Sequence, residues 1–151
     1  MDQIDRLINR EGGSKVVNLH GDTGGVTKYG ISSNNHPNVN VPKLSYQEAR
    51  EIYRKEYLEG PNIHLLPQPL QEQVFDFAVH SGPNTAIKKF QMILNLPETG
   101  KVGPELLEEL EQWDPMVVNN ALLKVRVFFL LNINKPQFWR GWIRRAMGFM
   151  V

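Results

Sequence analysis

Apolar residues recur at the three- and four-residue spacing of an α-helix along most of the chain. Glycine and proline interrupt the pattern at Gly12-Gly13, Gly60-Pro61 and Gly82-Pro83, where helices are expected to end or begin. Ser45, with Glu48 three positions later, forms a capping-box signature for the helix that follows. The pattern predicts helices over residues 1–10, 45–59, 69–81, 85–95, 104–111, 115–132 and 136–147.

A segment rich in glycine and polar residues separates the first two predicted helices. Val16-Val17 and the run Val26 to Ile31 are typical of short strands, joined by a polar turn from Asn18 to Gly25. A chain of 151 residues suffices for one hydrophobic core, and no linker or internal repeat divides it. We therefore expect a mainly α-helical single domain over residues 1–151, with a small β-hairpin near the N-terminus.

The composition excludes some kinds of binding site and indicates where the protein is expected to be made. The sequence contains no cysteine, so disulfides and thiolate metal sites are excluded. The first residues include Asp2, Asp5 and Arg6, unlike a secretory signal peptide. The apolar stretch Val125–Ile133 is far shorter than the roughly 20 residues that span a bilayer. We expect synthesis in the cytoplasm without a signal peptide, so export would depend on another agent.

Charge is unevenly distributed, although the formal net charge is only +1. No acid follows Asp114. The chain beyond that point carries six bases: Lys124, Arg126, Lys135, Arg140, Arg144 and Arg145. Two interpretations of the basic C-terminal helix stay open, a solvated face or a surface attracted to an anionic membrane or envelope.

Glu11 stands between an amphipathic helix and a pair of glycines, at the edge of the expected core. A carboxyl group partly withdrawn from water is held protonated, and such an acid can donate a proton to a leaving oxygen. Asp22, on the polar turn, is expected to stay ionised, and glycoside cleavage uses two carboxyl groups that differ in this way. The hydroxyl of Thr27 could hold the attacking water. The alternative for Asp22 is a purely structural role, because aspartate commonly forms glycine-rich turns.

The run E-G-G at Glu11, followed by D-T-G-G-V-T-K-Y-G-I-S from Asp22, closely resembles the signature of glycoside hydrolase family 108. These are phage-type and secretion-associated muramidases, which cut the glycan strands of peptidoglycan. V-F-D-F-A-V-H-S-G at residues 74–82 resembles a helix of that family, and F-W-R-G-W-I-R-R at residues 138–145 resembles its closing helix. F-Q-M-I-L-N-L-P at residues 90–97 is similar to the family's peptidoglycan-binding-like half.

The resemblance covers nearly the whole chain and implies a lysozyme-like helical domain. Residues 1–82 would carry the catalytic glutamate and the hairpin, and residues 83–151 would form a portion resembling a peptidoglycan-binding domain. By the same resemblance Glu11 is the general acid. The order of acid, aspartate and threonine is similar to that of phage lysozymes, which implies that Asp22 is the base or water holder and Thr27 its helper.

Three further residues are candidates for contact with the sugars. Tyr29 would stack on a sugar or fill the core as a strand aromatic. Asp76 would form a wall of the cleft or bond to the hairpin from its helix. His80 stands where the family's helix usually offers asparagine; the resemblance points it toward the cleft, and a helix-end cap or surface position is the alternative.

Two rival functions remain beside the muramidase. One is a peptidoglycan-binding module without catalysis, which would have no use for a desolvated acid at Glu11. The other is a helix-turn-helix nucleic-acid binder, which is disfavoured because only Lys88 and Lys89 lie on the would-be recognition helix. We therefore expect a monomeric muramidase with no cofactor and no metal, acting on peptidoglycan strands in the periplasm or cell wall during phage lysis or secretion. Nucleic acid is not an expected partner.

Overall fold

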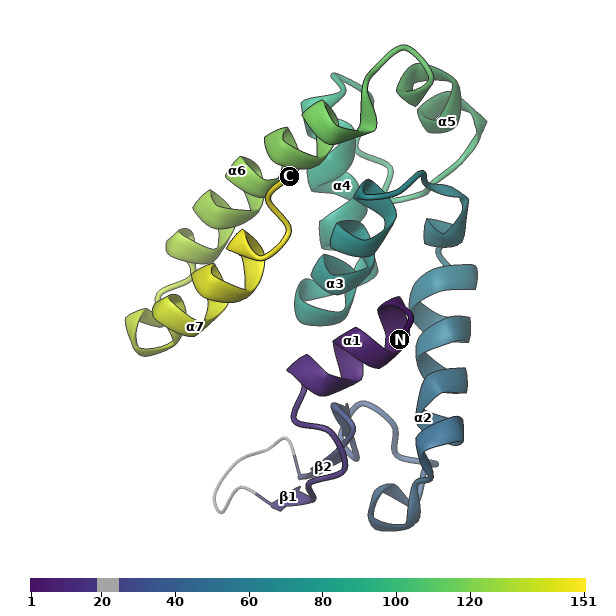
Figure 1. Ribbon diagram of the computed structural model, residues 1–151, viewed down its shortest axis with the longest axis vertical. Helices are drawn as coiled ribbons and strands as arrows, with labels where there is room; N and C mark the ends of the chain where they lie inside the picture. The colour runs from purple at the N-terminus through teal and green to yellow at the C-terminus, as the bar shows by residue number, and fades with distance from the viewer. Residues whose placement is uncertain (19–24) are drawn as a thin grey trace. The chain divides into compact units, whose positions relative to one another are not determined.

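The computed structural model describes residues 1–18 and 25–151, and the chain divides into two compact units, residues 1–56 and 57–151. Both units are mainly helical (Figure 1). The predicted mainly α-helical fold with a small antiparallel β element near the N-terminus is confirmed. The boundary between the units falls after Glu56, whereas the two portions expected from the sequence meet after Gly82.

The first unit combines helices with a small sheet. Its described elements are α1 (Gln3–Arg10), β1 (Val17–Asn18), β2 (Val26–Lys28), β3 (Ile31–Ser32), the 3-10 turn η1 (Val41–Lys43) and α2 (Tyr46–Tyr53), which the π-helical segment η2 (Arg54–Glu59) continues. The predicted capping box of Ser45 and Glu48 opens α2. A second capping box, formed by Asp2 and Asp5, opens α1. Each box pairs two backbone donors that the first helical turn leaves without partners.

The sheet has one strand more than the predicted hairpin. β2 pairs antiparallel with β1 on one side and with β3 on the other. Tyr29 and Gly30 join β2 to β3 with φ values of 55° and 80°, which is the pattern of a type I′ turn. The run Val26 to Ile31, predicted as one strand, therefore folds back on itself after Lys28.

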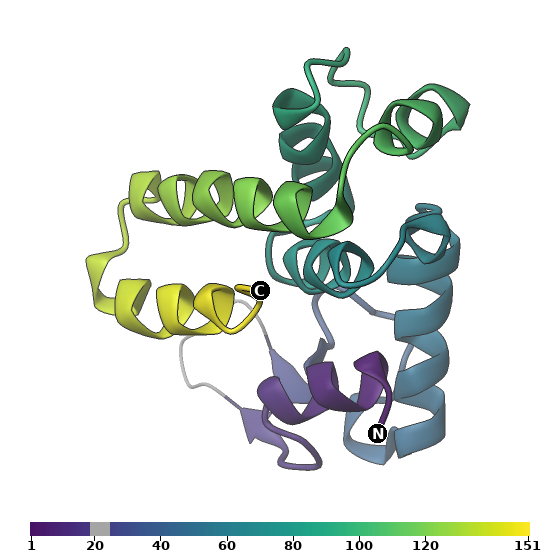
Figure 2. The ribbon, with the colours of Figure 1, turned by 45° about the horizontal axis from the view of Figure 1, so that its top comes forward.

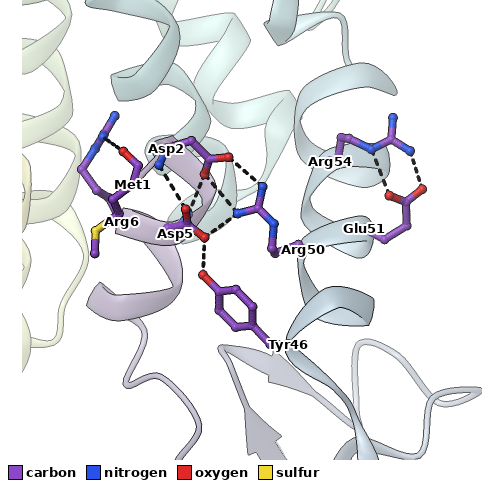
Figure 3. Close-up of polar contacts among 8 residues, drawn as sticks. All are labelled: Met1, Asp2, Asp5, Arg6, Tyr46, Arg50, Glu51 and Arg54. Carbon is purple, nitrogen blue, oxygen red and sulfur yellow. Dashed lines mark hydrogen bonds and ion pairs between the residues drawn. The ribbon is translucent and has the colours of Figure 1, made fainter.

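A fork of hydrogen bonds holds α1 against α2, as Figure 3 shows. Arg50 donates to Asp2 at 2.6 Å and to Asp5 at 2.5 Å, and the Tyr46 hydroxyl donates to the same Asp5 carboxylate. The hydrogen bond from Arg50 holds the pKa of Asp2 well below its usual range, and the bond from Tyr46 lowers the pKa of Asp5. Both shifts favour the charged carboxylates, so these bonds stabilise the fold above the ordinary aspartate pKa of 3.8.

The second unit is built from helices. Its elements are the 3-10 turn η3 (Ile63–Leu65), α3 (Leu70–Ser81), α4 (Pro83–Ile93), α5 (Pro104–Leu110), α6 (Pro115–Asn132) and α7 (Pro136–Met147). α6 and α7 run antiparallel side by side (Figures 1 and 2). Gly82, with φ of 91°, separates α3 from α4 at the predicted break, and Asp114 caps α6 through the amide of Met116.

The interior of the second unit is centred on α3, whose residues from Gln73 to Ala78 are all fully buried. Gln73 donates from its side-chain amide to the backbone and side chain of Asn119 on α6, so this buried polar group is paired. Among the helices of residues 1–18 and 25–151, none combines the length and the apolar character needed to cross a lipid bilayer.

The fork around Arg50 predicts that Arg50→Gln lowers the melting temperature by roughly 3–6 °C at pH 7, since it removes charge-assisted hydrogen bonds between two helices. Thermal unfolding followed by circular dichroism measures this. The difference from wild type should shrink as the pH falls below about 3.8, where Asp2 and Asp5 of the unfolded chain take up protons.

Arg54→Gln is the matched control, because Arg54 pairs with Glu51 within one helical segment and both side chains are more than 40% exposed (Figure 3). Its effect should stay within about 2 °C. Equal losses for the two variants would mean that the Arg50 fork contributes no more than a surface ion pair.

Candidate active site

The position of Glu11 follows from the way α1 ends. Glu11 is the C-cap residue, and the amides of Gly12 and Gly13 donate to the carbonyls of Asn9 and Ile8 at 3.3 and 3.0 Å. This is a Schellman motif, which requires a left-handed residue directly after the cap, and Gly12 supplies it with φ of 98°. The backbone of the candidate acid is therefore held by the helix end, and its side chain is half-buried.

The loop after Glu11 is joined to the hairpin by the backbone. The Tyr29 amide donates to the Gly13 carbonyl at 3.0 Å. This bond brings the turn of Tyr29 and Gly30 beside the candidate acid. A Cβ atom on Gly30 would lie 2.7 Å from Cβ and 2.9 Å from Cγ of Glu11, and it would also collide with the Tyr53 hydroxyl. The stem of Glu11 therefore occupies space that only glycine leaves empty.

Thr27 and Tyr29 lie in the same unit as Glu11. Thr27 is half-buried in β2, the central strand, opposite Val17 and Ser32. The Tyr29 ring is half-buried and lies edge-on to Tyr46, with ring centroids 5.7 Å apart and planes at 72°. The ring therefore packs on a neighbour and keeps part of its surface exposed, and contact of Tyr29 with a sugar stays a prediction. Asp22, the candidate base, lies outside the described residues.

Asp76 is an interior counter-ion of the second unit. Its side chain has no exposed surface, and its carboxylate accepts hydrogen bonds from Arg126 at 2.6 Å and from Arg145 at 3.0 Å. Burial alone would raise the pKa of Asp76, but the two guanidinium groups outweigh burial and hold it below its usual range. This enclosure favours the structural alternative for Asp76: its single negative charge is shared by two arginines of the helical core.

His80 lies one helical turn after Asp76 on α3, and its ring meets Trp142 of α7 edge-on, with centroids 5.5 Å apart. Burial, followed by the charges of Arg145 and Arg126, lowers the pKa of His80 to about 4. The imidazole is therefore neutral at pH 7. Contact of His80 with a sugar stays a prediction.

Two residues of this arrangement were not identified from the sequence. Gly30 makes room for the acid, and Tyr53, on α2, donates its hydroxyl to the Tyr29 carbonyl at 2.7 Å. The Tyr-Gly pair inside an otherwise strand-like run was a usable signal for a turn. Nothing local marks Tyr53, because its partner is 24 positions away.

A metal site or a binding groove among the described residues would be a further sign of function. In residues 1–18 and 25–151, no three His, Asp or Glu side chains are arranged to hold a metal ion. A groove of about 500 Å³ does occur in the first unit, lined by the loop at Asn38 and by α2 and η2 from Glu48 to Glu56. The candidate residues described in the first unit, Glu11, Thr27 and Tyr29, do not line this groove.

The helical fold, with a small antiparallel sheet beside a glutamate at a helix end, defines a lysozyme-like protein. The family model for glycosyl hydrolase 108 matches residues 4–82, just over half of the chain. The chain therefore belongs to the glycosyl hydrolase 108 family, and its class of activity is that of a glycoside hydrolase. All six candidate site residues fall within the matched range.

A solved structure, that of Brucella abortus SagA, is similar along almost the whole chain. The TM-score is 0.85 at 27% sequence identity, and the match covers 97% of this chain and 88% of SagA. A comparison with the curated proteins finds no match. The family and this structural neighbour together support a peptidoglycan hydrolase.

Gly30→Ala should abolish the alignment of Glu11, because the new methyl group would occupy the space of the glutamate stem. We expect a loss of at least about 10²-fold in hydrolysis of peptidoglycan, the scale of a displacement of about 1 Å at a catalytic group. The decrease in turbidity of purified cell walls measures it.

Gly82→Ala separates this clash from ordinary backbone strain. Gly82 also has a positive φ, of 91°, but a Cβ atom there would meet nothing within 4 Å. Both variants should lose about 1–3 kcal/mol of stability, because an L side chain is strained at positive φ. Gly82→Ala should keep activity within about threefold of wild type; equal activity of the two variants would contradict the role of Gly30.

Proposed function

We propose that the protein is an N-acetylmuramidase, which hydrolyses the β-1,4 bond between N-acetylmuramic acid and N-acetylglucosamine in peptidoglycan. The observation that carries this proposal is the placement of Glu11. The end of α1, the Gly13–Tyr29 hydrogen bond and the open face of Gly30 all serve to hold one half-buried carboxyl group. A passive wall-binding module would not need such a group.

In the proposed reaction Glu11 gives its proton to the glycosidic oxygen while the bond from that oxygen to the anomeric carbon breaks. The electron pair leaves with the oxygen of N-acetylglucosamine. A water molecule forms the new bond to the anomeric carbon and gives up its own proton to a base, the role we propose for Asp22, with Thr27 orienting the water. We propose inversion of configuration, which uses a water between carboxyl groups roughly 6.5–9.5 Å apart.

The setting we propose is the periplasm or cell wall, during phage lysis or wall remodelling for secretion. The portion from residue 83 to 151 is proposed to help bind the glycan strand, as its resemblance implies, within a single monomeric domain. The basic C-terminal helix adds a proposed contact with an anionic membrane or envelope. Arg140 and Arg144 on α7 are exposed, and no acid lies anywhere after Asp114.

Glu11→Gln should remove lytic activity on outer-membrane-permeabilised cells while leaving the circular dichroism spectrum unchanged, because glutamine keeps the shape of glutamate but has no acidic proton to donate. Glu98→Gln, at an exposed loop position, is the control and should remain active. Mass spectrometry of wild-type digests should find muramic acid at the reducing end. Anhydro-muramic acid would indicate a transglycosylase, and undiminished clearing by Glu11→Gln would refute the assignment of the acid.

The envelope contact predicts weaker killing of intact Gram-negative cells when Arg140 and Arg144 are both replaced by Gln, with unchanged activity on purified walls. Arg145 is left intact because it pairs with buried Asp76. The double variant Lys15→Gln with Lys101→Gln removes the same charge from exposed positions outside the tail, and it should kill as wild type does. Equal killing by all three proteins would leave α7 as an ordinary solvated face.

A further inference from the structure

We propose that Tyr53 is a positioning residue for the acid Glu11, acting through the turn of Tyr29 and Gly30. This inference rests on the proposed catalytic role of Glu11. Tyr53 lies on α2 and is only 1% exposed. Its hydroxyl nevertheless has a defined partner, the carbonyl of Tyr29 at 2.7 Å. A buried hydroxyl with such an acceptor holds the backbone it contacts in one place.

Tyr29 is held on both sides. Its amide donates to the carbonyl of Gly13, in the loop that leaves Glu11, and its carbonyl accepts from Tyr53. The two bonds point to different elements, the end of α1 and the side of α2. Together they set where the turn lies between these elements.

The position of the Tyr29–Gly30 turn determines how much space the Glu11 side chain has. The Tyr53 hydroxyl and the Cβ and Cγ atoms of Glu11 all lie on the side of Gly30 where a Cβ atom would be. A Cβ atom built on Gly30 would be less than 3 Å from each of these three atoms. A movement of the turn would therefore shift the stem of Glu11 directly. The hydroxyl of Tyr53 is the group that resists this movement from the side of α2.

α2 is itself fixed, so it can serve as a reference for the acid. Tyr46, Arg50 and Tyr53 follow one another at helical spacing along one face of α2. Tyr46 and Arg50 bind the start of α1, whereas Tyr53 binds the turn beside its end (Figure 3 shows the first two). The same helix face thus sets the position of α1 at its first turn and that of the hairpin beside its last residue.

A tyrosine at this position could equally be a packing residue, and the variant Tyr53→Phe separates the two roles because phenylalanine keeps the buried ring. With soluble, uncross-linked peptidoglycan chains as substrate, positioning predicts that kcat falls by about 10- to 100-fold. KM should stay within about twofold, since the sugars' binding contacts are not removed. Amide hydrogen exchange at Tyr29, followed by NMR, should become faster.

Tyr46→Phe is the comparison variant. It removes a hydroxyl from the same face of α2 but keeps the edge-on contact with Tyr29, and the lost bond holds the first turn of α1 rather than the turn beside Glu11. It should lower the melting temperature and reduce kcat far less than Tyr53→Phe does. Wild-type kcat in Tyr53→Phe, or unchanged exchange at Tyr29, would overturn the inference and leave Tyr53 as a packing residue. A loss of kcat explained by the unfolded fraction alone would overturn it too. Activity in Glu11→Gln would instead refute the proposed function, whatever Tyr53→Phe does.

Discussion

The backbone hydrogen bond between Tyr29 and Gly13 is the constraint on which the first unit depends. It closes a loop of chain that begins at the end of α1 and returns through the sheet, and the glutamate sits where the loop starts. Four residues with positive φ, Gly12, Gly13, Tyr29 and Gly30, lie where the two peptide groups come together. The Glu11 side chain can take its position only when the backbone has this geometry. Gly30, which has no side chain, is therefore as important for the site as Glu11 itself.

The main ion pairs of the two units differ in how far they are buried. In the first unit the fork from Arg50 is partly open to water and joins two surface helices, so it contributes modestly and depends on ionised carboxylates. In the second unit Asp76 and Arg126 are both completely enclosed. A buried pair of this kind contributes little net stability compared with apolar residues, but loss of Asp76 would leave the Arg126 guanidinium in the core without its carboxylate. Asp76 thus joins α3 to α6 through Arg126 and to α7 through Arg145.

Much of the fold could be predicted from the sequence because it depends on interactions between residues that are close together in the sequence. The helices, the cap at Ser45, the break at Gly82 and the start at Asp114 all follow from residues within a few positions of each other. The turn after Lys28 was predicted as strand because the β-branched residues Val26, Thr27 and Ile31 favour a strand more strongly than the Tyr29-Gly30 pair favours a turn. The partners of Asp76 could not be predicted, because its arginines lie 50 and 69 positions away. The same pairing leaves the Arg145 side chain only 16% exposed, although the sequence places it in a basic tail. The location of Glu11 at a helix end was predictable, but the contacts that hold it were not, since they join three separate segments.

The neighbourhood of His80 gives the second unit a sensitivity to acid. In the folded protein the imidazole of His80 is neutral and lies near the guanidinium groups of Arg145 and Arg126. Its pKa of about 4 is below the ordinary histidine value of 6.5. Its favourable contribution is complete above pH 6.5 and disappears as the pH falls from there toward 4, because the unfolded chain then binds a proton that the folded one resists. Asp76 adds a second loss below its own ordinary range. Between pH 6.5 and 4 an acidic medium therefore lowers the free energy of unfolding of this unit, and the fraction of unfolded protein rises.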